Sequence, residues 1–191
     1  KSKPIILSTG LSDLETINDS VNFLISQNQI YKKAENLGIL QCTSLYPNLE
    51  NDCNLNMINQ FKRKFTATIG YSDHTTKSLA AEIAFTLGAE ILELHFTDKK
   101  DKRAFRDHQV SFTKDDIINL INKIKEINAL KGISEKHILN SEIKTEHVVS
   151  FKRAIYPKET IKKGHKISVA DLVCLRPMKG IEAKYLYNLI G

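Results

Sequence analysis

Two histidines follow short apolar segments of the chain, and their side chains first suggest a functional site. Over residues 90–96 the strand period of two places Glu93 and His95 on one face. The same count places Ser72 and His74 on one face of the preceding apolar segment. Parallel sheets and TIM barrels carry their binding and catalytic groups at the carboxyl ends of strands. Imidazole and carboxylate groups gathered there can bind a metal ion or move protons, although a strand-end histidine is more often a hydrogen-bonded surface residue.

Four strand and helix pairs would position these groups. We expect strands over 3–8, 38–43, 66–72 and 88–97, and helices over 13–25, 55–61, 77–87 and 113–132. Four consecutive units of this kind predict an α/β fold with a parallel sheet and right-handed crossovers. Polar strand ends favour the C-terminal half of a (β/α)8 TIM barrel, since a free four-stranded sheet would leave two edges to protect. Little of the chain precedes the first strand, so we expect it to be part of a longer protein.

The pattern changes after residue 134, where the predicted half-barrel ends. Residues 135–147 are polar and lack an apolar period, which predicts a linker. Residues 148–191 alternate short apolar runs with turn residues. This alternation predicts a small β-rich domain, with the chain stopping before that domain is complete.

Composition narrows the classes of function. The 191 residues carry a net charge of +6, but the basic residues are scattered and not interleaved with aromatics, so we expect no nucleic-acid binding. Such a charge also suits a phosphorylated or carboxylated small substrate. No apolar run is long enough to span a membrane and no signal peptide stands out, so we expect a cytoplasmic protein without membrane association. Cys42, Cys53 and Cys174 are far apart in sequence and are expected to be structural thiols.

Five motifs in a fixed order carry a resemblance to a known family. They lie at residues 3–10 (KPIILSTG), 42–47 (CTSLYP), 70–75 (GYSDHT), 93–98 (ELHFTD) and 107–108 (DH). Together they resemble the sialic acid synthase family, which comprises the N-acetylneuraminate synthases and their legionaminic and pseudaminic acid relatives. The tail, over residues 153–177, is similar to the antifreeze-like (SAF) domain that follows the barrel in that family.

The resemblance implies a reaction and a cofactor. Members of the family condense phosphoenolpyruvate with the open-chain aldehyde of an N-acetylmannosamine-like sugar, which gives a nine-carbon 2-keto acid and phosphate. They require a divalent metal ion, typically Mn²⁺ or Mg²⁺. By this resemblance His74 and His95 are the metal ligands, and the ion polarises the aldehyde oxygen. Glu93 is similar to the family's active-site glutamate, which contacts sugar hydroxyls and moves protons.

The same resemblance implies substrate binding by six residues: Lys3, Ser44, Tyr46, Ser72, Asp107 and Arg176. Asp107 is similar to the aspartate that holds the sugar. Lys3 and the hydroxyl residues fall on motif positions that bind the carboxylate and phosphate of phosphoenolpyruvate. Arg176 lies in the antifreeze-like tail, which in the family reaches the site of a neighbouring subunit. The expected assembly is therefore a domain-exchanged homodimer.

Several positions depart from the family's pattern. Ser44 stands where many members have asparagine, and Met178 replaces a common glycine. Phe105 and Arg106 replace a Gly-Pro pair, so the loop loses its usual turn chemistry and is expected to hold a different sugar. The first half of the barrel, with further substrate-binding groups and another catalytic glutamate, is not in the chain. We therefore expect these 191 residues alone to be inactive.

Alternative interpretations remain open at this point. Glu93 could pair with a lysine, and three hydroxyl residues could simply cap loops: Ser44, Tyr46 and Ser72. The chain could also be a non-catalytic half-barrel and antifreeze-like piece that acts in binding or assembly. Within the enzyme class, the alternative is a synthase for a diacetamido sugar of the legionaminic or pseudaminic acid type.

Overall fold

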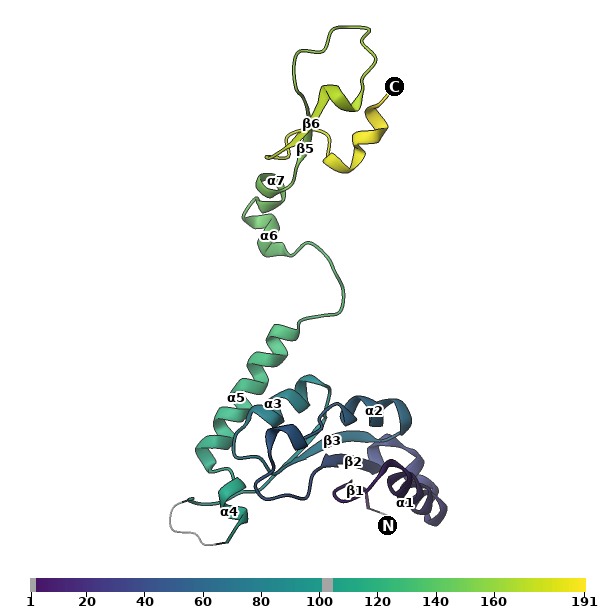
Figure 1. Ribbon diagram of the computed structural model, residues 1–191, viewed down its shortest axis with the longest axis vertical. Helices are drawn as coiled ribbons and strands as arrows, with labels where there is room; N and C mark the ends of the chain where they lie inside the picture. The colour runs from purple at the N-terminus through teal and green to yellow at the C-terminus, as the bar shows by residue number, and fades with distance from the viewer. Residues whose placement is uncertain (1–2, 101–104) are drawn as a thin grey trace. The chain divides into compact units, whose positions relative to one another are not determined.

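The structure, a computed structural model, describes residues 3–100 and 105–191. It divides into two compact units at Gly132, and each unit is described by itself (Figure 1). The first unit mixes helices with a four-stranded sheet, and the second holds a two-stranded sheet. Within the described residues, no helix is both long enough and apolar enough to cross a membrane.

The first unit alternates strands and helices in the predicted order. Its strands are β1 (Ile5–Ser8), β2 (Leu37–Cys42), β3 (Thr68–Asp73) and β4 (Ile91–Leu94). Its α-helices are α1 (Leu14–Gln27), α2 (Met57–Lys64), α3 (Leu79–Thr86), α4 (Asp107–Val110) and α5 (Lys114–Lys131). Its 3₁₀ helices are η1 (Gln29–Lys32), η2 (Ala34–Asn36) and η3 (Glu50–Asp52).

The four strands form one parallel sheet in the order β1, β2, β3, β4. Consecutive parallel neighbours require a crossover helix between each pair, and right-handed crossovers put those helices on one side of the sheet. Figure 1 shows α2 and α3 together on one side of β2 and β3. The unit thus has the architecture of half a TIM barrel, and the predicted α/β half-barrel is confirmed.

The helix-facing side of the sheet forms the core. Leu37, Ile39, Ile69 and Tyr71 are almost fully buried there, and Ile17 of α1 belongs to the same cluster. These residues alternate along their strands with residues of the opposite face, as the period of two predicts. The opposite face corresponds to the interior of a barrel.

On the interior face, the neighbouring strands pack closely around a glycine. Gly70 of β3 lies between Leu40 of β2 and Ile91 of β4 in the register of the sheet. A Cβ on Gly70 would lie 2.5 Å from the Ile91 backbone oxygen and 2.5 Å from Leu40 Cδ2. The three strands therefore pack this closely because residue 70 has no side chain. One step further along the strands, Ser72 and Glu93 are register partners.

Local capping signals define the helix ends. Asp13 caps α1, since its Oδ1 accepts from the Thr16 backbone N–H at 2.8 Å. Thr113 and Asp116 form a reciprocal capping box that starts α5. After α3, Gly88 takes a φ of +95°, a conformation that favours glycine. These ends lie where the sequence predicts them.

The last strand is shorter than expected. The strand period groups Phe96 with the apolar face of 90–96, but β4 ends at Leu94 and the Phe96 side chain is 65% exposed. Beyond Leu94 the chain continues into an isolated parallel bridge between Phe96 and Phe112. Phe96 is exposed because the packed sheet ends before this residue.

The second unit is small. Its elements are α6 (Asn140–Lys144), α7 (His147–Phe151), β5 (Ala154–Pro157), η4 (Val169–Asp171), β6 (Leu172–Leu175) and η5 (Ala183–Leu189). Strands β5 and β6 pair antiparallel. The predicted linker at residues 135–147 contains α6, and its role as a linker stays a prediction. Short helices of this kind form by local hydrogen bonds without an apolar stripe, which leaves no periodic signal.

Candidate active site

His74 follows β3 at its carboxyl end and is held from two sides. Its Nδ1 lies 2.8 Å from the Thr43 carbonyl oxygen, and its own carbonyl oxygen accepts from the Asn48 backbone N–H at 2.8 Å. Because a carbonyl oxygen can only accept, Nδ1 must carry the proton. The Nε2 atom of a neutral His74 therefore keeps its lone pair, which is the state that a metal ligand needs.

His95 lies beside His74 on the neighbouring strand end. The ring centroids of the two histidines are 5.2 Å apart. Tyr46 contacts both rings, with its centroid 4.1 Å from that of His74 and 5.5 Å from that of His95. The three rings form a cluster at the carboxyl edge of the sheet, built from the loops that follow β2, β3 and β4.

Ser72 holds the carboxylate of Glu93 on the interior face. The Ser72 hydroxyl donates to Glu93 Oε1 at 2.7 Å, and Ser72 itself is only 3% exposed. The two residues are register partners on β3 and β4, so the pleat of the sheet points both side chains the same way. This contact fixes one oxygen of Glu93 and leaves the other to face the open interior.

Asp107 reaches the same cluster from α4. Its Oδ2 lies 3.9 Å from His95 Nδ1, and its Oδ1 lies 3.6 Å from Arg106 Nε. The Arg106 guanidinium lies over the Tyr46 ring, with Cζ 5.0 Å from the ring centroid. Arg106 thus connects the loop after β2 with the loop after β4, a contact that the sequence analysis did not predict.

Burial changes the acid–base behaviour of two groups near the histidines. It raises the pKa of the Tyr46 hydroxyl, so Tyr46 stays a neutral donor at physiological pH. It also raises the pKa of the Asp73 carboxyl, which is 1% exposed. Asp73 Oδ1 accepts from the Thr75 backbone N–H at 2.8 Å. This bond shapes the turn that presents His74, and the sequence analysis missed Asp73 because a carboxylate next to a histidine has no distinctive spacing.

The donor set suits a divalent ion with two protein ligands. A first-row ion lies about 2.1 Å from each imidazole nitrogen, so rings at this separation can share one. Within residues 3–100 and 105–191, no group of three or more His, Cys, Asp and Glu side chains could hold a metal ion. An ion at His74 and His95 would thus depend on water and substrate for its remaining ligands.

The structure does not bring Lys3 to the cluster. Lys3 precedes β1, whereas His74 and His95 follow their strands, and all the strands run parallel. At about 3.3 Å per residue, Lys3 lies roughly 20 Å from the histidines, at the opposite edge of the sheet. Its carbonyl oxygen accepts from the Tyr31 hydroxyl at 3.1 Å. Parallel strands thus separate Lys3, which precedes a strand, from the histidines, which follow theirs, and the assignment of Lys3 to substrate binding stays a prediction.

Two further predicted residues stand apart from the ring cluster. Ser44 lies in the loop after β2, and a Cβ on Gly10 would overlap its hydroxyl oxygen. This packs Ser44 against the end of β1 and leaves it exposed. Arg176 belongs to the second unit, where its guanidinium lies over the Phe151 ring at 5.4 Å. The role of Arg176 toward a neighbouring subunit remains a prediction.

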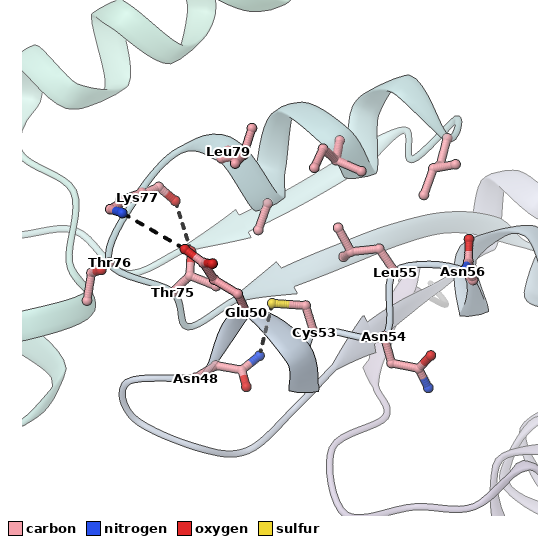
Figure 2. Close-up of a pocket in the computed structure, with 13 residues that line it drawn as sticks. Asn48, Glu50, Cys53, Asn54, Leu55, Asn56, Thr75, Thr76, Lys77 and Leu79 are labelled. Atoms are coloured by element: carbon pink, nitrogen blue, oxygen red, sulfur yellow. Dashed lines mark hydrogen bonds and ion pairs between the residues drawn. The ribbon is translucent and has the colours of Figure 1, made fainter.

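A separate cavity of about 500 Å³ lies on the helix side of the sheet (Figure 2). Figure 2 shows it between α3 and the segment that carries Cys53 and Leu55, with the Lys77–Glu50 ion pair at one end. Asn48 lines this cavity and donates through its backbone N–H to His74. The cavity contains neither histidine, so it is not the predicted site.

Comparison with known proteins identifies the family. The model of the NeuB family matches residues 1–136. The chain belongs to the NeuB family. The N,N'-diacetyllegionaminic acid synthase of Campylobacter jejuni is 33% identical over 190 residues, covering 100% of this chain and 55% of that relative. The synthase of the same name from Legionella pneumophila is 31% identical over 191 residues, covering 100% of this chain and 52% of that relative.

A solved structure of a sialic acid synthetase also resembles this chain. The N-acetylneuraminic acid (sialic acid) synthetase of Leptospira borgpetersenii matches with a TM-score of 0.65 and 28% identity, covering 75% of this chain and 48% of that one. This NeuB chain spans about half the length of the curated relatives it matches. The resemblance to sialic acid synthases is therefore confirmed, whereas the antifreeze-like assignment of the second unit stays a prediction.

Proposed function

We propose that the protein to which this NeuB chain belongs is a sialic-acid-type synthase. It would condense phosphoenolpyruvate, an N-acetylmannosamine-like aldehyde and water into a nine-carbon 2-keto acid and inorganic phosphate. The enol carbon of phosphoenolpyruvate would bond to the aldehyde carbon, and the aldehyde oxygen would take a proton and become a hydroxyl. Membership of the family and the printed names of the relatives support this class of reaction.

The observation that carries the proposal is the pair of histidines with a fixed tautomer. His74 donates from Nδ1 to the Thr43 carbonyl, so its Nε2 is free, and His95 lies 5.2 Å away between ring centroids. These two residues would hold Mn²⁺ or Mg²⁺, and the bound ion would act as a Lewis acid toward the aldehyde oxygen. Both imidazoles adjoin the Tyr46 ring, which covers one side of the pair.

The chain's own side chains would orient the sugar and move the proton. Ser72 fixes Glu93 through the 2.7 Å hydrogen bond, so the carboxylate can accept from sugar hydroxyls or exchange a proton with the developing hydroxyl. Tyr46 would donate from its neutral hydroxyl to an anionic substrate oxygen. Asp107 would hold the sugar beside His95. Arg176 from a neighbouring subunit would complete the site in a domain-exchanged homodimer.

The test is a coupled assay on the full-length protein. Phosphoenolpyruvate, Mn²⁺ and a panel of 2-acetamido and 2,4-diacetamido sugars are supplied, and phosphate and 2-keto acid are both measured. His95→Ala should abolish turnover and leave the fold intact by circular dichroism. His137→Ala, at an exposed position of the second unit, is the matched control and should keep wild-type activity. Full turnover by His95→Ala at saturating Mn²⁺, or no keto acid from any sugar with the wild type, would overturn the proposal.

A further inference from the structure

We infer that Arg106 is a specificity-determining residue that, together with Asp107, recognises an amide group of the acceptor sugar. This inference rests on the proposed function, because it assigns a role within the same site. Arg106 has no predicted role in the sequence analysis, and its side chain is 69% exposed. Its assignment comes from three features of the structure: where the guanidinium lies, which of its donors are free, and which acceptor lies beside it.

The guanidinium is fixed at the mouth of the ring cluster. Its Cζ lies 5.0 Å from the Tyr46 ring centroid, a separation typical of a cation–π contact. Tyr46 in turn contacts His74 and His95. The Tyr46 ring occupies one side of this exposed guanidinium, so its remaining N–H groups are open to a ligand. A substrate bound at the histidines would therefore meet the edge of Arg106.

Most of the donors of Arg106 are unused. Arginine carries five N–H donors, and Arg106 presents only Nε toward Asp107, at 3.6 Å from Oδ1. In the part of the chain that the structure describes, the two terminal nitrogens have no acceptor. Asp107 is also underused: no described side chain or backbone group donates to its carboxylate within hydrogen-bond distance, and Oδ1 is buried without a partner. Because Oδ1 is buried, the carboxylate oxygen that a ligand can reach beside the Arg106 donors is Oδ2.

An amide matches this pair. Its carbonyl oxygen can accept from a terminal nitrogen of Arg106 while its N–H donates to the carboxylate of Asp107. A phosphate suits the pair less well, because Asp107 and Glu93 both bring negative charge to this side of the site. A hydroxyl can also accept from Arg106 and donate to Asp107, but its oxygen is a weaker acceptor for a guanidinium than an amide carbonyl oxygen, and mannose tests this alternative in the experiment below. The acylamino groups of an amino sugar are therefore the favoured ligand.

The experiment compares acceptors that differ by one group. Wild type, Arg106→Met and Arg106→Lys are assayed as full-length proteins with mannose, N-acetylmannosamine, a 2,4-diacetamido mannose-type sugar and N-acetylmannosamine 6-phosphate. Arg106→Met keeps an unbranched apolar stem but no donor, and Arg106→Lys keeps the charge but loses the planar fork. Arg63→Met is the matched control, since Arg63 is an exposed arginine on helix α2, away from the ring cluster.

In the wild type, a sugar with one more acetamido group should have a higher kcat/KM than the sugar without it. We expect Arg106→Met to reduce this ratio by about tenfold or more, because the KM of the acetamido sugar rises. The KM of phosphoenolpyruvate should not change, Arg106→Lys should recover only part of the loss, and Arg63→Met should match the wild type. An equal loss for every acceptor, no loss for any, or a loss confined to the phosphorylated sugar would overturn the inference.

A binding measurement separates this inference from the proposed function. Sugar binding to wild type and Arg106→Met is measured by saturation-transfer NMR without phosphoenolpyruvate. If the wild type turns over no sugar, the proposed synthase reaction fails. In that case, the assignment of Arg106 to amide recognition is supported if acetamido sugars bind the wild type but not Arg106→Met. It is overturned if the two proteins bind these sugars equally.

Discussion

Ser72→Ala should lower the proposed synthase activity of the full-length protein without unfolding it. The substitution removes the hydroxyl that donates to Glu93 Oε1 at 2.7 Å. A hydrogen bond to a charged group contributes a net free energy of about 1.5–3 kcal/mol. Because Glu93 is exposed to water, we take the lower value of this range. A loss of ~1.5 kcal/mol of transition-state stabilisation corresponds to about a tenfold fall in kcat. Stability should change by less than ~1 kcal/mol, because water can solvate the freed carboxylate.

The chain offers a matched control for this variant. Ser78 donates to Glu82 Oε1 at 2.6 Å, the same pair of residue types at nearly the same distance. This pair lies at the start of α3, and Lys123 also donates to Glu82 at 2.7 Å. Ser78→Ala should therefore leave kcat unchanged. Phosphate release with saturating substrates measures kcat for both variants, and urea unfolding measures their stability.

Two results would refute this reasoning. If Ser72→Ala retained wild-type kcat, Ser72 would not orient a catalytic Glu93. If Ser72→Ala and Ser78→Ala lost activity equally, the loss would report general damage to the unit and not the interior face of the sheet.

Three further predictions concern the sheet, a helix cap and the metal. Gly70→Ala should destabilise the protein by about 1–3 kcal/mol in urea unfolding, because the added Cβ would lie 2.5 Å from the Ile91 backbone oxygen. Gly38→Ala should cost less, because the atom nearest to its added Cβ is the end of the flexible Ile91 side chain, at 3.0 Å. A larger loss of stability in Gly38→Ala than in Gly70→Ala would contradict this account. Thr113→Ala should cost ~1 kcal/mol by removing the cap of α5. Hydrogen bonds from the Thr113 backbone and hydroxyl lower the pKa of Asp116. The ionised Asp116 therefore stabilises the folded protein at pH values above the usual aspartate pKa, and this stabilisation is lost as the pH falls. A stability loss in Thr113→Ala that became larger on acidification would contradict this account. A chelator should abolish phosphate release, with recovery on adding Mn²⁺ and no effect on the far-ultraviolet circular dichroism; activity in excess chelator would contradict the role of His74 and His95.

Sequence patterns predicted the half-barrel because its signals are local. The apolar runs act over a few residues, and so do the cap at Asp13 and the glycine at position 88, which lie at the ends of helices predicted over 13–25 and 77–87. The face assignment of Ser72 and Glu93 also follows from strand parity alone. Side-chain burial along α5 does not follow from apolar residue type alone: Leu120 is 3% exposed but its neighbour Ile121 is 47% exposed.

Several features of the structure needed information beyond local sequence pattern. Lys3 shares a motif with the strand that follows it, yet a motif does not state which end of the strand faces the site. The helix α6 formed in a segment with no apolar period. The contact of Arg106 with Tyr46 was invisible to the sequence analysis, because the two residues come from different loops and their types alone do not pair them.

By itself the sequence determined the order of strands and helices, which face of each strand is polar, and the position of two histidines at strand ends. Only the tertiary structure decided the tautomer of His74 and which residues contact the two histidines. The tautomer of His74 depends on the Thr43 carbonyl, 31 positions away, and Tyr46 reaches both rings from the loop after another strand. The parallel sheet brings the carboxyl ends of distant strands to one edge, and contacts between the loops there depend on backbone geometry that no local pattern encodes.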